Sequence, residues 1–164
     1  MRYTLALLAF AALATTARAQ SASQDVRIYA TDITGLTLTD DAVDIPLDAL
    51  DLTGTNLTGT GQSGMSIQTN ILLYKISAQL DEDYSEGVEL AVSLDFSEVG
   101  LPGGIDPLKQ TLSADESKDL VVGLSPLATS DIIVDYEATA PLTVGTDYDD
   151  TSEVTFTITS VIGL

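Results

Sequence analysis

The sequence predicts an all-β protein: a two-sheet antiparallel β-sandwich of about seven to nine strands with Ig-like or jelly-roll topology. Three observations predict this fold. Apolar and polar residues alternate with a period of two along most of the chain, no segment has a long helical period, and turn-forming residues separate the alternating segments. A closed β-barrel is the alternative architecture.

The alternating segments predict the individual strands. The most regular is residues 88–96, in which every second residue is apolar. Residues 66–80 form a strand region that is broken near Asn70, and Pro46 makes its segment an edge strand or a bend, because proline cannot donate a ladder hydrogen bond. In chain order, strands are predicted at residues 25–31, 33–38, 43–52, 66–80, 88–96, 120–124, 131–140 and 154–159.

Glycine, proline and acidic residues predict the connections. Residues 53–64 hold four glycines among Thr, Ser and Asn, which is typical of a loop. The acidic residues 81–86 predict a turn that joins the strands on either side into a hairpin. A Pro/Gly loop is expected at residues 99–106, and the capping-box spacing of S-A-D-E predicts a short helical turn at residues 114–119.

The last strand, residues 154–159, reads V-T-F-T-I-T. Its apolar residues are expected to face the core and its threonines to face outward. The threonines could form a flat binding face, or they could be present only because Thr favours strands.

The first 19 residues have the features of a secretory signal peptide. A basic residue precedes an apolar run at residues 5–14, and A-R-A at residues 17–19 matches a cleavage site. The run is too short to span a membrane. We expect cleavage before Gln20, a single β-sandwich domain at residues 20–164, and a mature protein that is secreted, periplasmic or on the cell surface.

The chain is strongly acidic, with 25 acidic and six basic residues and a net charge of −19. Removal of residues 1–19 would leave four basic residues and a net charge of −21. Nucleic acids and anionic lipids bind through Lys and Arg, so neither is expected as a partner.

Missing residue types exclude several chemistries. The chain has no His and no Cys, which rules out a Ser-His-Asp triad and a Cys nucleophile and argues against zinc, copper and iron sites. A carboxylate pair, as in glycoside hydrolases, is the catalytic scheme that remains. We predict that the protein is not an enzyme.

Two acidic clusters could bind calcium, which prefers oxygen ligands. Neither follows the EF-hand pattern, and the alternative for both is a solvated turn of a very acidic protein. A third, more widely spaced group of aspartates is expected to form a solvated face. The first cluster is Asp81, Glu82 and Asp83, the second is Asp147, Asp149 and Asp150, and the third is Asp40, Asp41, Asp44, Asp48 and Asp51. Apart from calcium, no cofactor is expected.

Five segments carry a family resemblance: SIQTNILLYKISAQL, GVELAVSLDF, LVVGLSP, IIVDYEATA and EVTFTITS. Together they resemble small secreted bacterial β-sandwich proteins of surface and fimbria-like families, which often end on a V-T-[YF]-T-[IL]-T strand. The resemblance covers residues 64–160. It implies an Ig-like fold and structural, adhesive or fibre-forming roles, and it carries over no catalytic residues.

These observations favour an exported structural or interaction protein whose partner is itself or another surface protein. Val26, Ile28 and Ala30 form an apolar ridge that could complete a neighbour's sheet by strand addition, or that could pair within its own domain. The alternatives are a surface module that binds carbohydrate or a partner protein and, less favoured, a glycoside hydrolase with two carboxylates.

Overall fold

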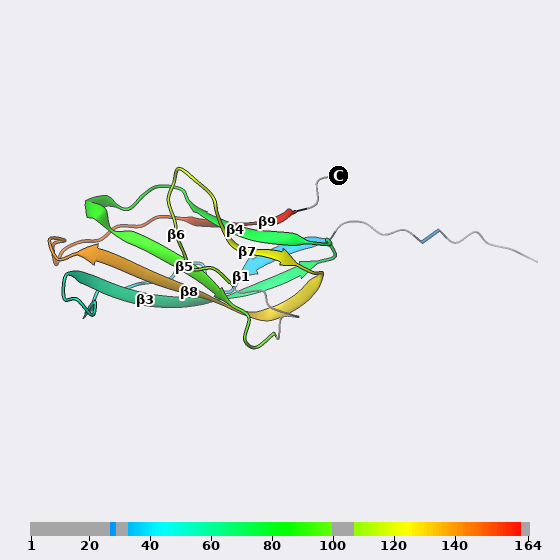
Figure 1. Ribbon diagram of the computed structural model, residues 1–164, viewed down its shortest axis with the longest axis horizontal. Helices are drawn as coiled ribbons and strands as arrows, with labels where there is room; N and C mark the ends of the chain where they lie inside the picture. Colours follow the sequence, from blue (N-terminus) through cyan, green and yellow to red (C-terminus); the bar gives the residue numbers. More distant parts are fainter. Residues whose placement is uncertain (1–26, 29–32, 100–106, 162–164) are drawn as a thin grey trace, which may run out of the picture. The chain divides into compact units, whose positions relative to one another are not determined.

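The computed structural model describes residues 27–28, 33–99 and 107–161 (Figure 1). Two antiparallel sheets pack against each other, which confirms the predicted two-sheet β-sandwich. Both sheets belong to one compact unit, Thr31–Leu164. None of the described segments forms a helix long and apolar enough to cross a membrane.

The larger sheet has six strands in the order β1-β3-β8-β5-β6, and β2 also pairs with β3. Its centre is the long antiparallel pair of β3 and β8 (Figure 1). The strands are β1 (Thr34–Leu38), β2 (Ala49–Leu50), β3 (Asn56–Thr69), β5 (Glu89–Asp95), β6 (Gln110–Thr111) and β8 (Leu127–Pro141).

The smaller sheet has three strands in the order β7-β4-β9. β4 (Tyr74–Leu80) is central, and β7 (Lys118–Leu124) and β9 (Val154–Ser160) are its two edge strands. β1 of the larger sheet lies close to β9, and β6 lies close to β7.

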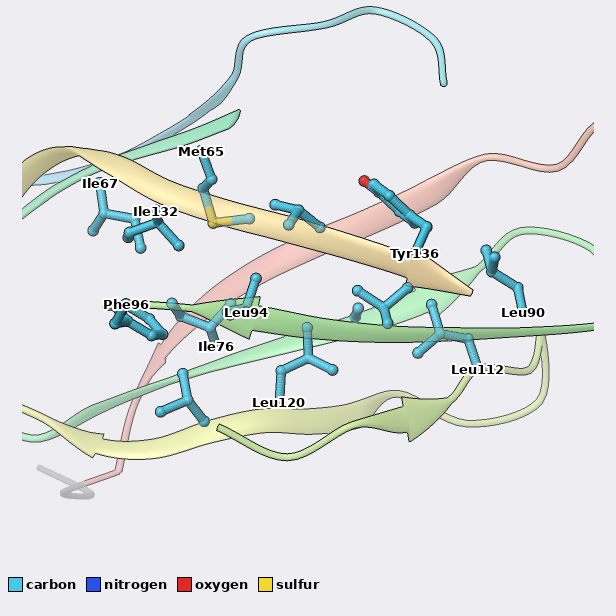
Figure 2. Packing of buried hydrophobic residues seen from close by; sticks show 14 of the residues in the cluster. Met65, Ile67, Ile76, Leu90, Leu94, Phe96, Leu112, Leu120, Ile132 and Tyr136 are labelled. Carbon is cyan, nitrogen blue, oxygen red and sulfur yellow. The ribbon is translucent and has the colours of Figure 1, made fainter. Parts of the chain in front are cut away.

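The core lies between the two sheets, as period-two alternation requires (Figure 2). Strands of both sheets contribute side chains that are almost fully buried. They include Met65 and Ile67 from β3, Ile76 from β4, Val92 and Leu94 from β5, Leu120 from β7, and Ile132 and Val134 from β8.

The prediction of a loop at residues 53–64 is wrong for most of its length, because β3 begins at Asn56. The glycines serve close packing here. A Cβ at residue 59 would lie 2.2 Å from the carbonyl oxygen of Pro46, and a Cβ at residue 61 would lie 2.6 Å from a methyl group of Val43. The segment between β1 and β2 therefore approaches the backbone of β3 at positions where only glycine leaves room.

The predicted hairpin across the acidic turn is also wrong. The turn contains a 3-10 helix, η1 (Ser85–Gly87), and it connects β4 in one sheet to β5 in the other. β4 pairs with β7 and β9, whereas β5 pairs with β8 and β6. Both strands bury apolar residues on their inner faces, so placing them in opposite sheets lets those faces pack against each other.

The helical turn predicted at residues 114–119 is absent, since this segment is a bend that leads into β7. Asp83 accepts the Ala114 N–H at 2.7 Å, and Gln79 donates to the Ala114 carbonyl at 2.6 Å. Side chains from the neighbouring turn and strand thus satisfy both backbone groups of Ala114 without a helix. Of the predicted strand at 25–31, only Arg27 and Ile28 are described, and they lie outside any strand.

Candidate functional site

The two predicted calcium clusters lie at the same end of the sandwich, although about 65 residues separate them in sequence. The acidic turn after β4 and the acidic segment before β9 are joined by hydrogen bonds between Asp81 and Ser152 and between Ser85 and Asp150. This convergence follows from the pairing of β4 with β9, in which Leu80 lies opposite Val154.

Asp81 fixes the start of β9. Its carboxylate accepts the Glu153 N–H at 2.7 Å and the Ser152 hydroxyl at 2.8 Å, while its own N–H donates to the Glu153 carbonyl at 3.0 Å. The Glu153 N–H first, and the Ser152 hydroxyl second, hold the pKa of the Asp81 carboxyl below its usual value. These contacts extend the β4–β9 ladder by one residue pair.

Asp150 holds η1 in the same way. It accepts the Ser85 N–H at 2.9 Å and the Ser85 hydroxyl at 2.7 Å, and the Tyr148 hydroxyl lies 3.2 Å from the same oxygen. The two bonds from Ser85 lower the pKa of the Asp150 carboxyl. Burial raises the pKa of the nearby Tyr84, and the negative charge of Asp150 raises it further.

The structure does not bring the other predicted calcium ligands together at one metal site. Asp83 caps the Ala114 N–H, and Asp147 and Asp149 are exposed. Within the described parts of the chain, no three acidic side chains lie close enough to hold a metal ion. The contacts that the structure shows for Asp81, Asp83 and Asp150 are hydrogen bonds that tie loops together, and calcium binding at either cluster stays a prediction.

In the third acidic group, Asp40, Asp41, Asp44 and Asp48 are exposed, as expected for a solvated face. Asp51 differs. It accepts bonds at 2.9 Å from the Thr55 N–H, the Thr53 hydroxyl and the Asn56 amide, which together fold the turn before β3. Desolvation raises the pKa of Asp51, but these hydrogen bonds outweigh it and leave the pKa far below the usual value.

A carboxylate pair occurs on the outer face of the larger sheet. Asp135 and Glu137 of β8 line one shallow depression. Gln62 donates to Asp135 at 2.7 Å, and Lys109 forms an ion pair with Glu137. Asp135 thus binds the neighbouring β3, and Glu137 binds the residue just before β6. Sequence reasoning missed this pair, because the partners of the two acids lie 73 and 28 residues away and no local spacing reveals them.

One buried hydroxyl has no hydrogen-bond partner among the described residues. Tyr74, the first residue of β4, is fully buried, and burial raises its pKa to about 12. It lies in the apolar core rather than in a site with other polar groups. Its raised pKa keeps this phenol protonated near neutral pH.

The two edge strands of the smaller sheet, β7 and β9, differ in the features that hinder pairing with a further strand. On β7, Lys118 and Asp119 bring charge, the register with β4 shifts twice, and the Leu108 N–H bonds the Leu120 carbonyl at 2.8 Å. β9 lacks the first two features, because its seven residues carry no charge and pair with β4 without a register shift. No described strand pairs with its other side, although β1 lies close to it.

β9 also retains apolar surface. The inward-facing residues Val154, Phe156 and Ile158 pack against the core, as predicted, but they are only half-buried. The outward threonines at 155, 157 and 159 are exposed. An uncharged, regular edge strand with an incompletely covered apolar face is the kind of strand that accepts another strand.

Comparison with known proteins returns no assignment: no family model matches the chain, and no curated protein is significantly similar to it.

Proposed function

We propose that this chain is an exported, non-enzymatic structural or interaction protein of the cell surface or extracellular matrix, which assembles into fibres or layers by strand addition. The observation that carries the proposal is the β9 edge, which is uncharged, regular and paired on one side only among the described strands. A strand added there would gain main-chain hydrogen bonds to β9.

The sequence supports the same conclusion. The N-terminal residues have the pattern of an export signal, and the chain lacks His and Cys, which most nucleophilic and metal-dependent hydrolases use. The carboxylates with the most hydrogen bonds, Asp81, Asp150 and Asp51, hold loops and turns in place. Their contacts therefore support a structural role for these three carboxylates.

The test is to express the full chain with its N-terminal segment in a bacterial host and to find the protein outside the cytoplasm. The purified exported protein is then examined by analytical ultracentrifugation and negative-stain microscopy over a range of protein and NaCl concentrations. We expect association that grows with both concentrations, because salt screens the repulsion between copies with a large negative charge. A strictly monomeric protein under all conditions, or one retained in the cytoplasm, would contradict the proposal.

A further inference from the structure

The outer face of the larger sheet carries a polar depression that assembly through β9 does not use. We propose that this depression binds a neutral carbohydrate. The inference goes beyond the proposed function and does not depend on it, because the depression lies on the larger sheet whereas β9 belongs to the smaller one.

Strand pairing builds the depression near the centre of the sheet, where β8 lies between β3 and β5 (Figure 1). Asp135 and Glu137 of β8 point away from the core, because the alternate residues Val134 and Tyr136 are buried in it. Directly opposed residues of antiparallel strands point to the same face, so each acid lies in a row with one residue of β3 and one of β5. The first row is Gln62, Asp135 and Ser93, and the second row is Thr60, Glu137 and Ala91.

The depression is open to solvent and has the size of a ligand site. Its volume is about 590 Å³, within the usual range for small-molecule sites. Thr60, Gln62 and Lys109 are exposed, and the side chain of Glu137 is nearly half exposed. The hydroxyl groups of Thr60 and Ser93 form no hydrogen bond with any described residue, so both are available to a ligand.

The two carboxylates are held in place but are only partly used. Gln62 donates to one oxygen of Asp135 at 2.7 Å, and Lys109 donates to one oxygen of Glu137. Each carboxylate therefore keeps a second oxygen that can accept a hydrogen bond, and the Lys109 ammonium keeps N–H groups that can donate. Because these side chains are already oriented, a ligand would bind with little further ordering of them.

These unused groups select the class of ligand. An apolar ligand would leave them unpaired, and an anion would be repelled by a chain of net charge −19. A calcium ion needs several oxygens around it, and in the part of the chain that the structure describes no three acidic side chains come close enough together. A sugar hydroxyl both donates and accepts, so neighbouring hydroxyls of one sugar can donate to the carboxylates and accept from Lys109.

The lining also predicts the strength of binding. Among the described residues that line the depression, Tyr136 alone is aromatic, and its side chain is buried in the core. A bound sugar would therefore be held by hydrogen bonds without an aromatic ring to stack on. We expect weak binding to a single copy, with a Kd of about millimolar order.

Titration of the ¹⁵N-labelled full chain with neutral sugars, followed by NMR, tests the inference. The probes are glucose, galactose, mannose and N-acetylglucosamine, each as the monosaccharide and as a short oligosaccharide. We expect at least one probe to give saturable shifts of the amide signals of Gln62, Ser93 and Asp135. The absence of a saturable shift with every probe, or shifts confined to other parts of the chain, would overturn the inference.

Matched substitutions then locate the binding. Asp135→Asn and Glu137→Gln each replace a charged acceptor in the depression and should weaken binding about tenfold, because hydrogen bonds to charged groups are the stronger ones. Asp131→Asn removes the same charge from an exposed position of the same strand, outside the depression, and should leave the affinity unchanged. Equal weakening by all three substitutions would reflect net charge alone and would contradict binding in the depression.

Calcium chloride, titrated alone, separates a carbohydrate site from a cation site. It should leave the signals of the depression unchanged, and if it shifts the same signals as the sugars do, the carbohydrate assignment is wrong. These outcomes are independent of the proposed function. A chain that stays monomeric in the ultracentrifuge can still bind a sugar on the larger sheet, and a chain that assembles through β9 can fail to bind one.

Discussion

The two edge strands of the smaller sheet share one central strand but differ in almost every feature that controls edge pairing. β7 is charged, irregular in register and hydrogen-bonded by Leu108, whereas β9 is uncharged and regular. Because both strands pack on β4 in the same sheet, the fold alone does not explain the difference. The comparison teaches that the two edges of one sheet differ in charge and in regularity, two features that control edge pairing.

The largest effect on stability is expected when the isoleucine at the centre of the smaller sheet is truncated, and its partner on the edge strand provides the comparison. Ile76 of β4 is fully buried and lies opposite Ile158 of β9, which is half-buried. Ile76→Ala should lower the free energy of unfolding by about 3 kcal/mol, and Ile158→Ala by about half as much in dilute solution. Urea denaturation measures both.

Protein concentration sharpens this comparison. If a second copy covers Ile158, the cost of Ile158→Ala should rise with protein concentration, because association stabilises the folded state and the substitution weakens association. The cost of Ile76→Ala should change little. A concentration-independent cost for both substitutions would indicate that the β9 face stays uncovered.

A medium effect on stability is expected at β7, the edge strand whose register with β4 is irregular. Gly123 of β7 has φ +84°, and a Cβ there would contact no atom within 4 Å, so Gly123→Ala tests backbone strain alone. We expect a loss of about 1–2 kcal/mol in the free energy of unfolding. Gly35→Ala in β1 is the control, because Gly35 lacks a positive φ and its Cβ would make ordinary contacts. Equal losses for the two variants would show that the β7 irregularity does not depend on Gly123.

The smallest effect concerns the hydrogen bonds that fix the start of β9. The pKa of Asp81 is lowered in the folded state, so its contribution to stability is fully present above the unfolded pKa of about 3.8 and is lost as the pH falls through the lower folded value. Asp81→Asn should therefore reduce the Tm at neutral pH, and the difference from the natural chain should vanish in acid.

Asp149→Asn is the control for this experiment. It removes the same charge from the same acidic end, but Asp149 is exposed, and the bonds to the start of β9 come from Asp81 instead. Melting curves between about pH 2 and 7 measure both variants. A Tm difference for Asp81→Asn that persists unchanged at the lowest pH would contradict the role of the ionised carboxylate.

Features that depend on local pattern could be predicted from the sequence. The alternation in β5 and β9 and the break at Asn70 were predicted correctly, because side-chain period and turn chemistry act over a few residues. The glycine-rich part of β3 is not recognisable as a strand from the sequence. Its glycines make room for Val43 and Pro46, which belong to another segment and pack against the β3 backbone.

The candidate site shows the same limit. The sequence identified the threonine and apolar faces of β9, but it could not show that β9 is an edge strand of the smaller sheet among the described strands, because strand order depends on long-range pairing. In the same way, the acidic clusters are evident in the sequence, but their partners Ser85 and Ser152 lie 65 and 71 residues from Asp150 and Asp81. Only the three-dimensional pairing of β4 and β9 brings them together.

Assembly through the β9 edge is tested most directly by isotope-filtered NMR on an equal mixture of ¹³C-labelled and unlabelled protein. The proposed function predicts intermolecular contacts that involve Phe156 and Ile158 of β9, and none from β7. Intermolecular contacts that arise from other strands, or a protein that shows no intermolecular contact at the highest concentration, would contradict it.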